Sequence, residues 1–256
     1  MKLTEIDAPD FDLAMTLGSG QVFHWDKIGK GFCGTIGAEA VYVEQAGDVL
    51  KVRDGEPPSP AREPRALPGI VAHYFALDHP LAQICAAFPR DAVMDEARDF
   101  CRGLRIIRQP KWECLATFIC SSMKQVAHIR QISRKLRERF GEARSPRRVR
   151  PVANKIDPPS PRLRRGGAII VYTFPSAERL AQSSEKELRR CALGYRAKNL
   201  LATARLVTSG EADLEKWSAL SDGDLRAKLC ELPGVGAKVA NCVMLFAYER
   251  LRAFPI

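Results

Sequence analysis

The pattern of apolar and polar positions divides this chain into a β-rich beginning and a helical remainder. Short segments rich in Val, Thr or aromatic residues, separated by turns that contain glycine, predict strands. They are Gln21–Trp25, Gly31–Ile36, Val41–Gln45 and Val49–Arg53. Because strands joined by short turns pair in opposite directions, we expect an antiparallel sheet. The proline-rich run at residues 56–60 ends this region.

Apolar residues recur at helical spacing from about Leu67 onward. Asp91 and Ser176 are placed to cap helices, and the periodic stretch Trp112–Phe140 is one helix or two. Further helices are expected at Lys186–Cys191, Ala197–Thr208, Leu214–Ala219 and Gly223–Glu231. The predicted fold class is α+β, with an N-terminal antiparallel β-sheet domain at residues 1–60 and a mostly α-helical domain at residues 61–256.

Charge and cysteine usage narrow the function classes. The formal net charge is +10, and the Pro- and Arg-rich segment 144–166, an expected loop, supplies much of it. The segment could follow a nucleic-acid backbone or be an insertion without a role. No apolar run reaches the ~20 residues of a membrane span, and the acidic start is not a signal peptide. The eight cysteines form no CxxC pair, so we expect reduced thiols and no metal site or cofactor.

One segment carries most of the chemical information. Leu232–Ala240 (LPGVGAKVA) lies between two helical patterns, and its proline and glycines favour a tight hairpin. Backbone amides at the start of the second helix would form an anion site suited to a DNA phosphate. Lys238 stands in the first turn of that helix. By spacing alone, it is either a reactive amine or a surface lysine that contacts phosphate.

Three further segments accompany this hairpin in a fixed order: Gly18–Trp25 (GSGQVFHW), Glu113–Ser122 (ECLATFICSS) and Leu193–Ala197 (LGYRA). Together the four resemble the helix-hairpin-helix DNA glycosylases, and within them the 8-oxoguanine DNA glycosylase family. The resemblance implies excision of 8-oxoguanine from duplex DNA, followed by cleavage at the abasic site. Lys238 matches the family's nucleophile, which attacks the sugar as an uncharged amine. Backbone amides matching Gly234, Gly236 and Val239 would hold a phosphate.

The resemblance also assigns the pocket for the flipped base. Gly20 matches the glycine whose carbonyl accepts the additional N7 proton of 8-oxoguanine. Guanine lacks that proton and would face the carbonyl with an acceptor. Cys242 matches a cysteine that stacks on the base. From the pattern alone, Gly20 could be a turn glycine and Cys242 a core thiol.

Four residues match positions near the cytosine opposite the lesion. Tyr195 and Arg196 match the aromatic wedge and the arginine that hydrogen-bonds to this cytosine; otherwise they are a buried tyrosine and a surface arginine. Met123 replaces an asparagine, and His128 replaces an arginine that reads cytosine. A thioether cannot make the hydrogen bonds of an amide. We therefore predict looser discrimination of the opposite base.

The sequence ends at Pro255-Ile256, where the resemblance places the catalytic aspartate as the next residue. We therefore expect a truncated chain that lacks the final helices and is a poor catalyst. Two alternatives stay open: a helix-hairpin-helix glycosylase for alkylated bases or oxidised pyrimidines, and a non-catalytic DNA-binding module. The expected partner is double-stranded DNA containing an oxidised purine. We expect a monomer without a membrane partner, cytoplasmic and nucleoid-associated in a bacterium or nuclear in a eukaryote.

Overall fold

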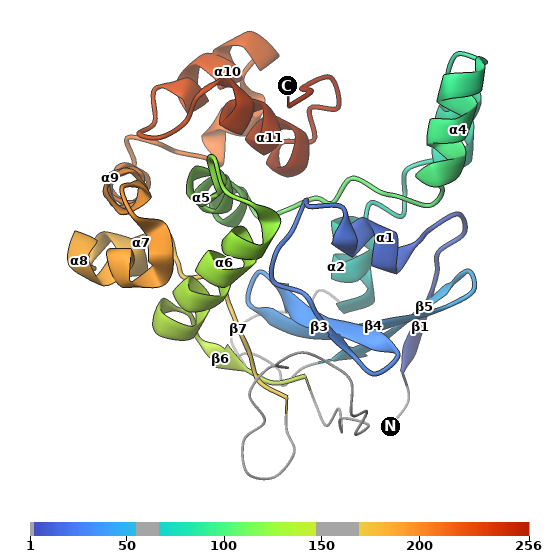
Figure 1. Cartoon of the computed structure of the whole chain (residues 1–256), viewed down its shortest axis with the longest axis horizontal. Coiled ribbons are helices and arrows are strands. Elements are labelled where there is room, and N and C mark those ends of the chain that lie inside the picture. The colour runs from blue at the N-terminus through green and yellow to red at the C-terminus, as the bar shows by residue number, and fades with distance from the viewer. Residues whose placement is uncertain (1–2, 55–66, 147–168, 256) are drawn as a thin grey trace. The chain divides into compact units, whose positions relative to one another are not determined.

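A computed structural model describes residues 3–54, 67–146 and 169–255 (Figure 1). The chain forms two compact units, one of Met1–Ile107 with Arg144–Val171 and the other of Arg108–Ala143 with Tyr172–Ile256. We refer to them as unit 1 and unit 2. The predicted proline-rich linker and most of the expected loop 144–166 lie outside the described residues. The α+β prediction is confirmed, since a sheet occupies unit 1 and helices dominate unit 2.

Unit 1 is built on a five-stranded antiparallel sheet of order β1-β5-β4-β3-β2. Its strands are β1 (Thr4–Asp7), β2 (Asp26–Ile28), β3 (Gly31–Ile36), β4 (Glu39–Ala46) and β5 (Val49–Asp54). Two-residue turns join β2 to β3, β3 to β4 and β4 to β5, so consecutive strands pair in the order of the chain. In the central pair, Cys33 lies opposite Tyr42.

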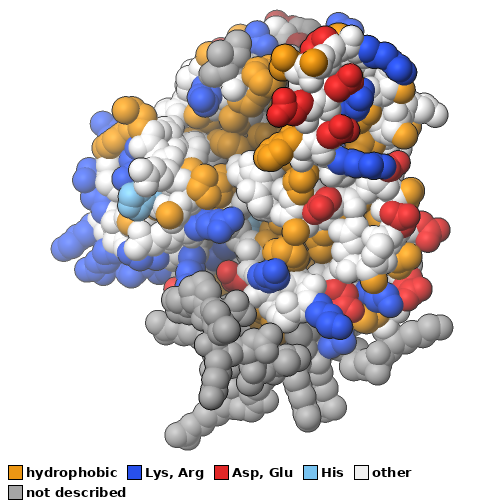
Figure 2. Space-filling model, turned by 45° about the vertical axis from the view of Figure 1, so that its right-hand side comes forward, with side chains coloured by type: hydrophobic (Ala, Val, Ile, Leu, Met, Phe, Trp, Pro, Cys, Tyr) orange, Lys and Arg blue, Asp and Glu red, His pale blue; other side chains and the backbone are white. Residues whose placement is uncertain are grey.

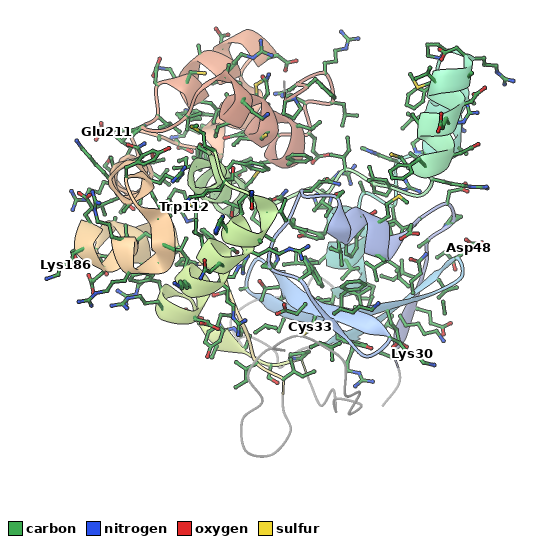
Figure 3. The ribbon with its side chains drawn as sticks, in the orientation of Figure 1. Lys30, Cys33, Asp48, Trp112, Lys186 and Glu211 are labelled. Carbon is green, nitrogen blue, oxygen red and sulfur yellow. The ribbon has the colours of Figure 1, made fainter. Side chains whose placement is uncertain are left out.

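Side chains of the sheet alternate between two buried faces. Val41 and Val43 of β4 belong to a core cluster with helical residues of unit 1, whereas Ala40 and Tyr42 belong to another cluster on the opposite face. The second cluster includes Cys33, labelled in Figure 3, together with residues that follow the undescribed segment. Both faces are therefore covered, which explains the nearly continuous burial of β3 and β4.

The helices of unit 1 are α1 (Leu13–Gly18), α2 (Leu67–Tyr74), α3 (Leu81–Ala86) and α4 (Ala92–Phe100). Leu13 and Leu17 of α1 and Val71 and Tyr74 of α2 pack into the same core as Val41. This packing places α2 in unit 1, so the structural boundary differs from the expected one at residue 60. Helix α4 has no buried residue and stands away from the sheet (Figure 1).

Unit 2 is mostly helical, and a two-stranded sheet of β6 (Ala143–Arg144) and β7 (Val171–Tyr172) lies where the chain changes units. Its helices are α5 (Lys111–Ser121), α6 (Val126–Phe140), α7 (Ala177–Ala181), α8 (Glu185–Leu188), the π-helix η1 (Arg189–Leu193), α9 (Arg196–Ser209), the 3-10 helix η2 (Lys216–Ala219), α10 (Asp222–Cys230) and α11 (Ala237–Ala247). Helix α5 contacts α6, α9 and α11, and all its residues from Glu113 to Cys120 are buried. It lies between these three helices in unit 2 (Figure 1).

The predicted strand Gln21–Trp25 is wrong. These residues form bends and extended backbone without a strand partner. Their side chains make the contacts instead: Trp25 covers Gly34 of β3, where a Cβ would lie 2.6 Å from the indole ring. The Trp25 Nε1–H donates to the Tyr74 hydroxyl at 3.2 Å. A segment that packs on the sheet through its side chains buries apolar residues as a strand does, which explains why the pattern misleads.

Candidate functional site

The hairpin between α10 and α11 is held by side chains of α9. Gly234 has φ +83°, and a Cβ on it would lie 2.8 Å from Asn199 Nδ2. The Thr203 hydroxyl donates to the Pro233 carbonyl at 3.2 Å. Glycine is therefore required at position 234 by both backbone conformation and space. The sequence identifies this glycine but contains no local signal for Asn199 or Thr203, which precede the hairpin by about 30 residues.

Lys238 is the second residue of α11, and its side chain is exposed. The N-cap residue, Gly236, supplies no side-chain hydrogen bond to the helix. Its carbonyl accepts the first intrahelical bond, from the Ala240 N–H at 2.9 Å. Amides of the first helical turn have no partner within the helix, so this end of α11 can bind an anion beside the lysine.

Cys242 lies one helical turn after Lys238 and is buried. Burial raises the pKa of its thiol to about 11, although the nearby Lys238 cation acts in the opposite direction. Near neutral pH the side chain is therefore an uncharged thiol. Phe118 and Phe246 stack with ring centroids 5.6 Å apart, and both belong to or pack against the core cluster that includes Cys242.

Asn241 connects α11 to the last described residues. Its Nδ2 donates to the Phe254 carbonyl at 2.9 Å, and its Oδ1 is buried with no hydrogen-bond partner among the described residues. A carboxylate at this position could not donate this hydrogen bond, so the amide of Asn241 is needed for the contact with Phe254.

The turn after α5 and the start of α9 meet through Arg196. This side chain is only 5% exposed, and its Nε donates to the Ser122 carbonyl at 2.9 Å. A second donor, Nη2, contacts the same oxygen. The guanidinium also lies over the ring of Tyr195, 4.3 Å from its centroid. A buried arginine thus fixes an exposed aromatic residue beside the turn that carries Met123.

Met123 and Tyr195 are exposed for residues of their size, at 94% and 59%. Met123 also adopts φ +52°, a conformation that costs free energy for any residue with a Cβ. Tyr195 is therefore not the buried tyrosine of the alternative interpretation, and Arg196 is not a surface arginine. His128 is exposed in the first turn of α6. An exposed apolar residue held in a strained conformation fits a surface that becomes covered by a ligand.

Gly20 lies in unit 1, whereas the other predicted site residues lie in unit 2. It follows α1 in a bend with φ +87°, and a Cβ added there would meet no atom within 4 Å. Within the described part of the chain, no N–H or O–H donates to its carbonyl oxygen. That oxygen is therefore available to a ligand.

Basic side chains gather on unit 2. Exposed cations of α6 and η1 are Arg130, Arg134, Arg139, Arg189 and Arg190. Burial raises the pKa of Cys191, and Arg139 and Lys135 oppose this shift, which places both cations near η1. On the face drawn in Figure 2, several Lys and Arg side chains gather at the left of the view. Such a surface favours a polyanionic partner.

Among the described residues, no group of three or more His, Cys, Asp or Glu side chains could hold a metal ion. No helix among these residues is long and apolar enough to cross a membrane.

Comparison with known proteins gives consistent matches. Residues 4–115 match the family model described as 8-oxoguanine DNA glycosylase, N-terminal domain. The N-glycosylase/DNA lyase OGG1 of Arabidopsis thaliana is 29% identical over 264 aligned residues, which cover 100% of this chain and 65% of that protein. The chain therefore spans less than two thirds of this relative.

Two solved structures agree with these matches. The structure of MBOgg1 with a low-affinity DNA ligand has a TM-score of 0.82 and 29% identity, and it covers 100% of this chain and 83% of its own. The Clostridium acetobutylicum 8-oxoguanine glycosylase/lyase with double-stranded DNA containing cytosine opposite 8-oxoG has a TM-score of 0.79 and 25% identity, with coverages of 100% and 83%. The matches run over the whole of this chain and over 83% of the two solved chains. By its sequence and its fold, the chain is similar along its whole length to 8-oxoguanine DNA glycosylases.

Proposed function

We propose that this protein is a base-excision repair glycosylase that removes 8-oxoguanine from duplex DNA and cleaves the resulting abasic site. The observation that carries the proposal is the exposed amine of Lys238 in the first turn of α11, directly after a hairpin whose amides can hold a phosphate. Nucleophile and anchor on one rigid element would keep the sugar at a fixed distance from the amine. The names of the matched relatives support the same activity.

The reaction follows from amine chemistry at the deoxyribose. The uncharged Nζ of Lys238 forms a bond to C1′ while the C1′–N9 bond breaks, and the electron pair leaves with the purine, which takes up a proton. The aminated sugar opens to an imine on Lys238. The imine acidifies the C2′ proton, whose removal lets the C3′–O bond break and release the 3′ phosphate. Water then hydrolyses the imine and frees the lysine.

Two groups would recognise the flipped base. The free Gly20 carbonyl would accept the N7–H of 8-oxoguanine and repel the bare N7 of guanine. Cys242 would stack on the base as a neutral thiol, in keeping with its raised pKa. Amides at Gly234, Gly236 and Val239 would bind the phosphate.

Four residues would act at the opposite strand. Tyr195 would replace the stacking lost when the base leaves the helix. The N–H groups of Arg196 that do not contact Ser122 could reach the cytosine. Met123 would fill the gap by bulk, and His128 would lie beside it. We propose a monomer that acts wherever its DNA is kept, in the nucleoid of a bacterium or the nucleus of a eukaryote.

Borohydride trapping tests the nucleophile. Reduction of the imine links the protein covalently to DNA, so a duplex containing 8-oxoguanine should give a trapped complex that Lys238→Gln abolishes. Lys186→Gln is a matched control, because Lys186 is an exposed lysine on α8 of the same unit (Figure 3). Trapping that persists in Lys238→Gln contradicts the proposal, whereas DNA binding without trapping supports the binding-module alternative.

Excision opposite each of the four bases tests the role of Met123. Because a thioether makes no amide-type hydrogen bonds, we expect excision opposite C and opposite A to differ by less than about tenfold in the wild-type protein. Met123→Asn combined with His128→Arg should increase the preference for C. Cleavage of a preformed abasic site is the control and should change little. A strong wild-type preference for C would count against this interpretation.

A further inference from the structure

Gln21, the residue after Gly20, has a buried side chain whose hydrogen bonds take the place of backbone pairing between strands. It is only 6% exposed. Its Nε2 donates to the Arg105 carbonyl at 2.9 Å, and its Oε1 accepts from the Ile107 N–H at 2.8 Å. One amide group thus pairs with two backbone groups of the segment 105–107, in the way that a neighbouring strand would.

The residue before Gly20 is fixed to the same network. Gln21 Nε2 also donates to the Ser19 hydroxyl at 2.9 Å, and Ser19 Oγ in turn donates to the Thr16 carbonyl at 2.8 Å. Thr16 is fully buried, and its hydroxyl accepts from the Arg105 N–H at 3.2 Å. Both neighbours of Gly20 are therefore tied down, whereas its own carbonyl has no donor among the described residues.

The segment that receives Gln21 is itself held in place. The buried guanidinium of Arg105 donates to the Ala76 carbonyl at 3.2 Å, the His79 carbonyl at 2.5 Å and the Pro9 carbonyl at 3.1 Å. Arg105 therefore connects the chain before α1 with the chain after α2. Gln21 is bonded to a fixed platform and not to a loose loop.

We infer that Gln21 is a positioning residue that sets the direction of the Gly20 carbonyl and so determines how well the protein distinguishes 8-oxoguanine from guanine. This inference rests on the proposed function, in which that carbonyl accepts the N7 proton. Discrimination by one hydrogen bond depends on the direction of the acceptor. At φ +87° the glycine has no side chain to restrict its rotation. Restriction must come from its neighbours, and Gln21 supplies most of it.

The test compares discrimination with lyase activity in the same variants. Gln21→Glu keeps the shape but replaces the N–H donor by an oxygen that faces the Arg105 carbonyl, and Gln21→Met removes all three hydrogen bonds. We expect the ratio of excision rates for 8-oxoguanine and guanine to fall by about tenfold or more, because an acceptor facing the wrong way loses one directional bond. Cleavage of a preformed abasic site, which needs no base recognition, should stay within about twofold of the wild type.

Gln45 provides the matched control. Its amide makes the same kind of clamp at the other end of α1, accepting from the Leu13 N–H at 2.8 Å and donating to the Phe11 carbonyl. Gln45→Met should lower stability and leave the discrimination ratio unchanged. If Gln45→Met lowers the ratio as much as Gln21→Met, the effect is general loosening of unit 1 and the inference is overturned.

A milder variant covers the case in which Gln21→Met does not fold. Ser19→Ala removes only the exposed hydroxyl link of the network, and we expect a smaller fall in the ratio, about threefold, at an unchanged melting temperature. Folded Gln21 and Ser19 variants with wild-type ratios overturn the inference and leave the proposed function standing. A wild-type protein that shows no preference for 8-oxoguanine over guanine overturns both.

Discussion

At the scale of single residues, the two hairpin glycines have different reasons to be glycine. Gly234 is in the left-handed region and lies against Asn199, whereas Gly236 has φ −98° and no atom near its missing Cβ. Gly234→Ala should therefore combine backbone strain of about 1 kcal/mol with a steric clash. We expect a lower melting temperature and about tenfold weaker binding to a duplex with a stable abasic-site analogue, measured by fluorescence anisotropy.

Gly236→Ala is the control for this prediction. It removes a favoured N-cap residue, at a cost of about 1 kcal/mol or less, but introduces no clash. Equal loss of stability and affinity in the two variants would mean that space around Asn199 does not matter. The sequence alone identifies both glycines as turn residues. It could not distinguish them, because the side chain that makes the difference belongs to α9.

At the scale of elements, a buried ion pair joins α5 to the helix that follows it. Glu113 and Arg137 are both largely buried, and the Arg137 guanidinium donates to Glu113 and to the Tyr172 carbonyl. Burial raises the pKa of Glu113, and the Arg137 cation opposes this. Arg137→Met removes the cation that pairs with this buried carboxylate, so we expect the free energy of unfolding in urea to fall by about 3–5 kcal/mol at pH 7.

The direction in which the stability of Arg137→Met changes with pH tests whether the buried carboxylate of Glu113 causes the loss. Without Arg137, the pKa of Glu113 in the folded protein rises further above its unfolded value, so the remaining stability is present at low pH and is lost as pH rises. Arg134→Met is the control, since Arg134 forms an exposed i,i+4 pair with Glu138 on the same helix. It should cost less than about 1 kcal/mol. Equal losses in Arg137→Met and Arg134→Met would contradict a buried pair.

The elements that the sequence predicts well are those with local signals. Asp91 and Ser176 cap α4 and α7 as expected, and β3 has the predicted bounds. The edge strand β1 shows no alternation of apolar and polar residues that would predict it, because its residues are mostly exposed. Helix α1 is missed as well, because its six residues are too few for a clear helical period. The same holds for the candidate site. Lys238 is predicted from its local motif, whereas the role of Gln21 depends on a hydrogen-bond partner 84 residues away in the sequence.

At the scale of the whole molecule, domain boundaries are least accessible to sequence reasoning. The change from strand to helix patterns predicted a boundary at residue 60, whereas unit 1 continues to Ile107 and takes in residues 144–171. Apolar residues of α2 complete the core of the sheet, and Ile169 and Val171 cover its other face. Secondary structure changes at residue 60, but the hydrophobic core does not. Which core a helix joins depends on tertiary packing, and the pattern of one segment does not contain that information.

Buried thiols in both units predict how stability depends on alkaline pH. Burial raises the pKa of Cys33 in unit 1 to about 12, and in unit 2 it raises that of Cys120 to about 12 and that of Cys242 to about 11. In the unfolded chain these thiols ionise near their ordinary value of 9.0. Above pH 9 the folded protein therefore binds more protons than the unfolded chain. The stabilisation that comes from the buried, protonated thiols is fully present below pH 9 and is lost as pH rises from 9 toward 11 or 12. Each thiol should lower the free energy of unfolding at pH 10 by about 1.4 kcal/mol relative to pH 7.

Urea unfolding at pH 7 and pH 10 under reducing conditions measures this loss. Cys33→Ala should be less stable than the wild type at pH 7, because it leaves a small cavity, yet it should lose about 1.4 kcal/mol less on going to pH 10. Cys230→Ala, which removes an exposed thiol, should lose as much as the wild type. If Cys33→Ala and Cys230→Ala lose equal stability between the two pH values, then Cys33 ionises in the folded protein as easily as in the unfolded chain. The burial of β3 between its two covered faces predicts the opposite, because a thiolate there would lose the water that stabilises its charge.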